Sequence, residues 1–295
     1  MNLQKAYDQK LIEIQQAKDF DKQAEIVKLI DYKYFVEVAG LPNTKIMKEK
    51  IIYLCSWFKV SDLKIMLKPD FLVNYRTGIS DVNEKNIINS KAWIQTAINF
   101  SNRIETKPYN AEKLKTYLPE LRSMTIQAPE VFLPRMRDIF AECGVAFVLL
   151  PNLKNSGVNG AVKWINDERV VLAMNNRRLD ADIFWFSLFH EVKHVLQRKI
   201  KTVFVSYDEK EMEEVNKQLE EEADNFATNY LIPASDFRRF SPTKFTSDAE
   251  ILAFAKSIGI HPGIVAGRLQ HEGILLPNRC SKFKEKYDIK INHTA

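Results

Sequence analysis

The sequence predicts an α+β protein in which a small, antiparallel-type sheet lies against one central helix. Helical periodicity dominates residues 1–125. Short apolar, β-branched runs then occur at 145–151, 161–165 and 169–174, and helical patterns resume near Asp180. Because the strands are few and lie between helical segments, we expect one small sheet packed against helices.

Composition fits a cytoplasmic globular protein. The chain has 295 residues, of which 45% are hydrophobic and 27% charged, which is enough to bury a sizeable core. The N-terminus has no apolar signal region and no run approaches 18 apolar residues, so we expect no membrane span. Three cysteines, far apart and without a CxxC pair, argue against a disulfide framework and favour a reducing compartment.

The first region, 1–125, is predicted to be all helical and carries no recognisable chemical motif. "GLPN" and "KPYN" break its helical pattern, and Ser61 is a plausible N-cap. We expect helices at 3–39, around 46–58, after Ser61, and at 84–106, 111–124 and 129–143, the last of these already beyond the boundary.

The second region, 126–295, is predicted to contain both the sheet and the chemistry. Its first strand follows Gly144, and "NDE" joins two further strands into a hairpin. We expect helices from Asp180 through the motif, from 211 to Pro233, and at 247–257 and 262–272.

The stretch "FHEVKH" points to a metal site. His190 and His194 are four residues apart, so they lie about 5–6 Å apart on one helix face and can reach one Zn²⁺. Glu191, about 100° further round the helix, can lie beside the metal without binding it and act as a general base. The alternative is two histidines that share a helix face by chance, but the apolar "FWFSLF" before the first histidine favours a rigid, buried site.

A third ligand is expected in "EEEADNFATNYLIP", since catalytic zinc sites take three protein ligands. With Ala223 at the centre of the buried helix face, Glu220 lies at its edge and Glu221 points to solvent. Asp224 is one turn after Glu220 and can accept a hydrogen bond from a ligating histidine. The alternative for this acidic run is a solvated helix face, which we accept for Glu221.

These two motifs together resemble the ImmA/IrrE family of metallo-endopeptidases. "GVAFVLLPNL", "NGAVKWIND" and "IGIHPGIVAGRLQHEG" are also similar to segments of its longer, HigA-like members. The resemblance implies a zincin-like domain with zinc on His190, His194 and Glu220, and Glu191 as catalytic base. It also implies a protein substrate, a helix-turn-helix repressor or antitoxin, whose cleavage controls a mobile-element, stress or toxin–antitoxin operon.

Two other functions stay open at this stage. Longer relatives carry an N-terminal helix-turn-helix domain that has no counterpart here, so we expect DNA reading to reside outside this sequence and DNA to bind weakly or through a partner. The domain could instead be a non-proteolytic antitoxin or regulator that binds a partner protein.

Residues 253–269 resemble a helix-turn-helix, in which Arg268 and His261 could reach DNA. The alternatives are a purely structural pair of helices, or a His261 that lines the active-site cleft. The oligomeric state is not predicted.

Overall fold

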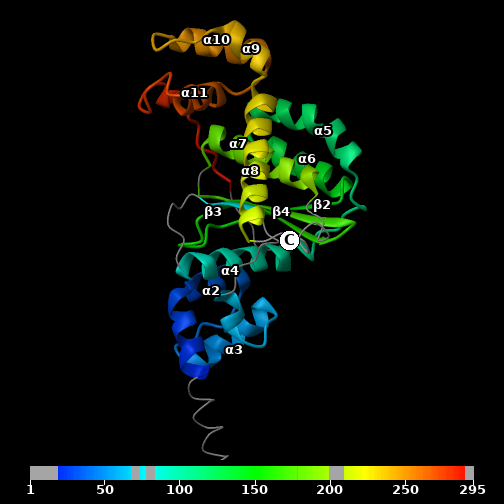
Figure 1. The fold of residues 1–295 in the computed structure, drawn as a ribbon, viewed down its shortest axis with the longest axis vertical. Coiled ribbons are helices and arrows are strands. Elements are labelled where there is room, and N and C mark those ends of the chain that lie inside the picture. Colours follow the sequence, from blue (N-terminus) through cyan, green and yellow to red (C-terminus); the bar gives the residue numbers. More distant parts are fainter. Residues whose placement is uncertain (1–18, 68–73, 78–83, 178, 199–208, 290–295) are drawn as a thin grey trace, which may run out of the picture.

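The computed structural model describes residues 19–67, 74–77, 84–177, 179–198 and 209–289 (Figure 1). Residues 19–29 are helical, and the labelled helices that follow are α2 (Tyr32–Ala39), α3 (Met47–Phe58), α4 (Glu84–Ser101), α5 (Ala111–Ser123), α6 (Pro129–Glu142), α7 (Ala181–Gln197), α8 (Glu209–Leu231), α9 (Ala234–Phe240), α10 (Asp248–Ile258) and α11 (Pro262–His271). The strands are β1 (Asn74–Thr77), β2 (Val145–Leu150), β3 (Val158–Asn166) and β4 (Arg169–Asn175). The α+β class predicted from the sequence is therefore confirmed.

The sheet contains both parallel and antiparallel pairs. The prediction of an antiparallel-type sheet was therefore wrong for one pair of strands. Its strand order is β1-β3-β4-β2. The β3–β4 hairpin is antiparallel, as predicted, but β2 pairs with β4 in parallel. The reason is topological. After β2 the chain continues into β3, which runs antiparallel to β2 but is not its neighbour in the sheet. The hairpin then returns β4 between β3 and β2, parallel to β2.

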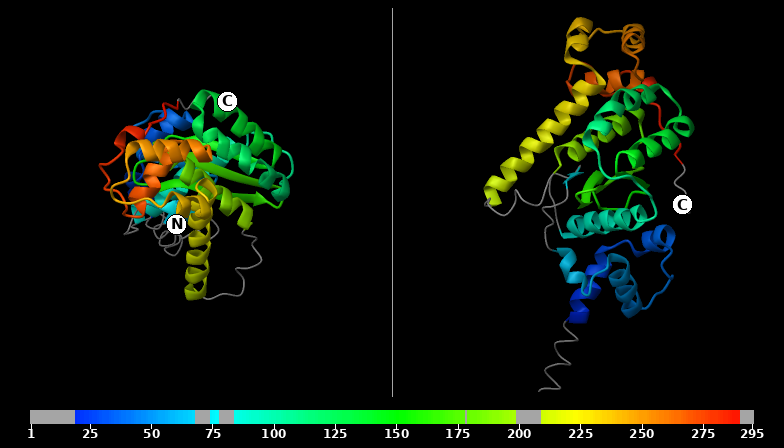
Figure 2. Two further views of the ribbon diagram at one scale, coloured as in Figure 1. Left: turned by 90° about the horizontal axis from the view of Figure 1, so that it is seen from above. Right: turned by 90° about the vertical axis from the view of Figure 1, so that its right-hand side faces the viewer.

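Both faces of the sheet are buried, and alternate side chains of β2 face two different layers. Val145, Phe147 and Leu149 join the core that includes α5, α6, α7 and α11. Ala146 and Val148 join the core built by α2, α3 and α4. Figures 1 and 2 show α4 on one side of the sheet and α6 and α7 on the other. The two-residue side-chain period of a strand explains this division.

The N-terminal region is not entirely helical, because β1 adds a strand to the edge of the sheet beside β3. Ile104 packs against the core built by α2, α3 and α4, whereas Leu114 is buried in the core that includes α5, α6, α7 and α11. Along the chain, the change between the two cores falls between these residues. The boundary at residue 125 stays a prediction. The stretch after Ser61 forms a short 3-10 helix, Leu63–Leu67, and part of the predicted helix 3–39 lies outside the described residues.

One glycine is required where α6 turns into β2. Gly144 has φ +82, a conformation that glycine adopts at little cost. A Cβ at this position would lie 2.3 Å from Tyr109 Cα. The close approach brings the loop before α5 against the start of the sheet, where Tyr109 also donates a hydrogen bond from its hydroxyl to Val195 O at the end of α7.

The C-terminal helices close the end of α7. The helix α10 begins with a capping box formed by Ser247 and Glu250, and α11 packs on α7. No single helix in the described ranges is long and apolar enough to cross a membrane; α10 and α11 meet the length and composition test only jointly, with a bend of 116° between them.

Candidate metal centre

The helix α7 holds its two histidines in the interior because it is apolar on nearly every side. Phe184, Trp185, Leu188 and Phe189 are all fully or almost fully buried. His190 and His194 are only 1% and 2% exposed. A helix packed on most of its sides leaves the imidazole rings little freedom, which suits a site that must hold a fixed geometry.

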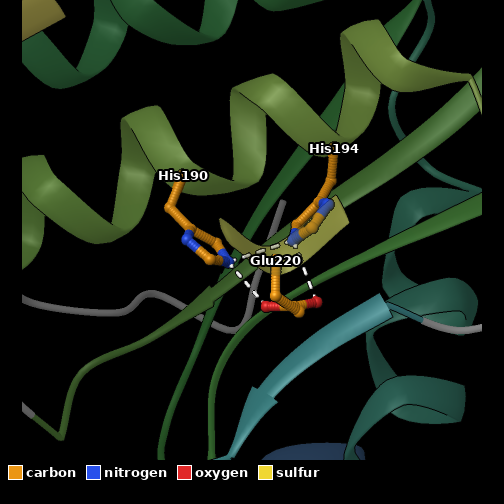
Figure 3. Close-up of side chains that lie close together, drawn as sticks. All are labelled: His190, His194 and Glu220. Carbon is orange, nitrogen blue, oxygen red and sulfur yellow. Dashed lines mark hydrogen bonds and ion pairs between the residues drawn. The ribbon is translucent and has the colours of Figure 1, made fainter. Parts of the chain in front are cut away.

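The helix α8 brings Glu220 to the two rings (Figure 3). Its buried residues Ala223 and Ala227 let α8 approach α7 closely. His190 Nε2 lies 3.2 Å from Glu220 Oε2, and His194 Nε2 lies 3.3 Å from Glu220 Oε1. The two Nε2 atoms are 3.0 Å apart. The three residues predicted as ligands therefore come together, with their ligand atoms within 4.8 Å of one another.

These separations fit a metal ion with tetrahedral coordination. Bonds of about 2.0–2.1 Å from zinc to nitrogen or oxygen place neighbouring ligand atoms roughly 3.3 Å apart. The donor set of two imidazoles and one carboxylate is also the set found at catalytic zinc sites such as that of thermolysin. The fourth coordination position would remain for water or substrate. The described residues of the site thus fit a divalent metal ion in both distance and chemistry.

Each histidine is oriented by a second hydrogen bond from its other ring nitrogen. His190 Nδ1 lies 2.9 Å from Asp224 Oδ1, and His194 Nδ1 lies 2.8 Å from Gln197 Oε1. Both partners offer oxygen acceptors, so each ring can donate its Nδ1–H to them while Nε2, which faces Glu220, remains the atom available to a metal ion. The sequence predicted Asp224 at such a position. It did not predict Gln197, although a polar residue three positions after His194 on the same helix was a usable signal.

Positive charge is favoured at the centre. Burial disfavours protonation of His190, but hydrogen bonds to Asp224 and Glu220 and the charge of Glu191 outweigh it and raise the pKa of His190 to about 9. Burial alone would raise the pKa of Glu220, but its contacts with the two histidines lower it to about 2. Carboxylates gathered in a partly desolvated site require a cation, which a proton on His190 or a metal ion can supply.

Glu191 is fully buried beside this cluster and is not one of the three residues whose ligand atoms converge. Strand β3 passes directly against it. A Cβ at Gly160 would lie 2.6 Å from Glu191 Oε1, so only glycine allows this approach. The carboxylate therefore lies between the axis of α7 and strand β3.

The exposure of Glu221 agrees with the predicted helix phase. Glu221 and Glu222 are both exposed. Glu222 accepts from Gln197 Nε2 at 3.2 Å and pairs with Lys193 Nζ at 3.2 Å. It therefore supports the amide that orients His194, from outside the metal cluster.

The helix-turn-helix look-alike contributes nothing to this cluster. His261 caps α11 by accepting a hydrogen bond from Gly263 N, and its Nε2 lies 3.2 Å from Glu285 Oε2. Arg268 donates to Ile232 O at 2.7 Å and to Glu272 Oε1 at 2.8 Å. Both side chains predicted as possible DNA contacts thus have internal partners.

Comparison with known proteins locates the family on this same part of the chain. The family model of the IrrE N-terminal-like domain, Peptidase_M78, matches residues 148–270. No curated protein matches the chain. The matched segment includes β3, β4, α7 and α8, and so contains all three residues of the metal cluster. The part of this chain that carries the candidate metal centre therefore resembles the IrrE N-terminal-like domain of this peptidase family.

Proposed function

We propose that the protein is a zinc-dependent endopeptidase. The observation that carries this proposal is the convergence of His190, His194 and Glu220 next to the buried carboxylate of Glu191. The family match supports a peptidase of this type. Zinc is the metal that best suits a compact site of two imidazoles and one carboxylate.

Zinc bound at this site supplies a Lewis acid for the peptide carbonyl and makes water more acidic. Glu191 accepts the proton from the attacking water and delivers it to the nitrogen of the departing amine. Its burial keeps bulk water away from this transfer. Asp224 and Gln197 hold the imidazole rings in the tautomer that leaves Nε2 free for the metal.

The substrate we propose is a regulatory protein with a helix-turn-helix, a repressor or an antitoxin. This class comes from the family resemblance, as does the consequence that cleavage controls a mobile-element, stress or toxin–antitoxin operon. A scissile segment would lie extended at the β1 edge of the sheet, beside β1 or in its place against β3, whose Gly160 borders Glu191, because β-strand addition is a common way to hold a peptide. A cytoplasmic location, expected from the cysteine usage, accords with such a substrate.

The test compares the wild type with Glu191→Gln, using Glu221→Gln as a matched control at an exposed glutamate. Native partners are captured with zinc-loaded Glu191→Gln, identified by mass spectrometry, and then incubated with each protein. We expect the Glu191→Gln protein to retain zinc and fold but to cleave about 10²–10⁴-fold more slowly, as loss of a general base does. The Glu221→Gln protein should cleave normally. Equal cleavage by all three would remove Glu191 from the mechanism, whereas a biological effect that persists without cleavage would favour a non-proteolytic binding module.

A further inference from the structure

A cavity of about 400 Å³ lies beside the candidate metal centre, a size typical of ligand sites. Its walls come mostly from α7, α8 and α11 and combine apolar side chains, such as Ile183, Phe186 and Ile264, with polar and charged ones, among them Asp182, Arg268 and His271. The ring of Phe186 is 6.5 Å from that of His190. Asn159, at another wall, directly precedes the glycine that contacts Glu191. The cavity is therefore open to a substrate side chain near the scissile bond.

A buried carboxylate lines this cavity. Asp182 is only 8% exposed, and its Oδ1 atom has no hydrogen-bond partner among the described residues. Its Oδ2 atom lies 3.6 Å from Lys284 Nζ. A Cβ at Gly267 would come within 2.5 Å of Oδ2, so α11 approaches this carboxylate only because that residue is glycine. Burial raises the pKa of Asp182, and Lys284 opposes this effect.

A buried acceptor without a donor is destabilising. The other acid that lines the cavity, Glu272, already accepts from Arg268 Nε at 2.8 Å. Arg268 in turn is committed to Ile232 O as well. Its Nε and Nη1 atoms are thus bonded elsewhere, and Asp182 contributes to the cavity wall a carboxylate whose buried Oδ1 has no hydrogen-bond donor among the described residues.

We propose that this cavity receives a substrate side chain next to the scissile bond and selects arginine or lysine, whose apolar stem fits the walls and whose terminal donor reaches Asp182. The proposal rests on the proposed peptidase function. Asp182 precedes His190 by eight residues on α7, about 12 Å along the helix axis, so only a long side chain spans the distance from the metal. Guanidinium and ammonium groups are also the donors that bind a buried carboxylate most strongly.

The structural alternative is that Asp182 only stabilises the fold. It lies in the first turn of α7, where a negative charge interacts favourably with the helix dipole, and it pairs with Lys284. That role would alter stability without altering substrate preference. Asp180, the N-cap residue of the same helix, makes no side-chain cap hydrogen bond and is not among the cavity residues. Asp180→Asn is therefore the matched control for loss of charge at this helix end.

The first experiment tests the cavity without catalysis. Binding of n-butylguanidinium to the zinc-loaded wild-type protein is followed by ligand-observed NMR, with Asp182→Asn and Asp180→Asn in parallel. We expect millimolar binding to the wild type and to Asp180→Asn, and at least a tenfold loss in Asp182→Asn, since the variant replaces a charged hydrogen-bond acceptor with a neutral amide. Binding that is absent from all three, or unchanged in Asp182→Asn, would overturn the proposal.

The second experiment measures preference during cleavage. Peptides of one sequence carry arginine, lysine, norleucine or leucine at the positions flanking the scissile bond, and kcat/KM is compared within each variant. The ratio of arginine to norleucine should fall at least tenfold in Asp182→Asn, stay constant in Asp180→Asn, and rise in Lys284→Gln, which removes the competing cation. A ratio unaffected by Asp182→Asn would overturn the inference and leave the peptidase standing. Probe binding that depends on Asp182, without cleavage of any peptide, would support the cavity and count against the peptidase.

Discussion

The helix pair α7–α8 matches the sequence pattern of a zinc site, and the pair α10–α11 matches that of a helix-turn-helix. The polar side chains of the two pairs have different partners. In the first pair, His190, His194 and Glu220 turn their ligand atoms toward a common point. In the second pair, His261 accepts a hydrogen bond from Gly263 N, and Arg268 donates to Ile232 O and to Glu272 Oε1. A pattern of residue types therefore indicates a binding site only when its polar groups converge on a point where a ligand can bind, and not when other groups of the protein already bond to them.

Removal of a histidine should give the largest effect and would test the first half of this comparison. We expect about one zinc per chain in the wild type and almost none in His190→Ala, because two remaining ligands do not form a stable site. His271→Ala, at an exposed histidine on α11, serves as the control and should keep its zinc. Metal analysis of protein prepared without chelators decides the matter; full zinc content in His190→Ala would disprove the site.

The three consecutive glutamates provide a second test, based on helix phase. Glu220→Ala should reduce zinc affinity sharply, because it removes the only carboxylate of the cluster. Glu221→Ala should have almost no effect, because Glu221 is exposed. Titration against a competing chelator measures both. A silent Glu220→Ala would show that the ligand set is wrong.

The partners of the histidine Nδ1 atoms should matter less than the ligands themselves. We expect Asp224→Ala to weaken zinc binding by about 10–100-fold, as is usual for residues that orient a ligating histidine. Gln197→Ala should have a similar or smaller effect, since its amide bonds to His194 and is supported by Glu222. The same chelator titration applies, and equal affinity in Asp224→Ala and wild type would contradict this role.

Substitution of Arg268 tests the other helix pair. Arg268→Ala should lower the free energy of unfolding by about 2 kcal/mol, because it removes charged hydrogen bonds and the contact of the guanidinium with Phe237, 3.9 Å from the ring centroid. Chemical denaturation measures this change.

DNA binding gives the smallest expected signal. The wild-type protein should bind DNA no more tightly than about 10⁻⁶ M at physiological salt, and Arg268→Ala should leave this unchanged. Titration with labelled duplexes at several salt concentrations checks both statements. A nanomolar affinity for a defined sequence would restore the DNA-binding interpretation of residues 253–269.

Local patterns allowed most of the helices and the main strands to be predicted. The i, i+4 histidine pair and the burial of Ala223 are set by the period of a single helix, so Glu220 and Asp224 could be placed from sequence as well. The parallel pairing of β2 with β4 could not, because it depends on contacts between strands that are distant in sequence. The same holds for β1, whose four residues carry little signal alone, and for the cavity, whose walls come from three separate helices.

The position of β1 has a thermodynamic consequence for any peptide that is to join the sheet. This strand pairs antiparallel with β3, with Tyr75 opposite Ala161, one residue beyond the glycine that borders Glu191; it is the cyan strand in Figure 3. An incoming strand at that edge must exchange with a tethered competitor. Its apparent affinity is then its intrinsic affinity multiplied by the fraction of molecules in which the edge is open. Every tenfold preference for the state in which β1 pairs with β3 thus costs the substrate about 1.4 kcal/mol of binding free energy. Peptides that pair only weakly with the sheet would therefore not displace β1.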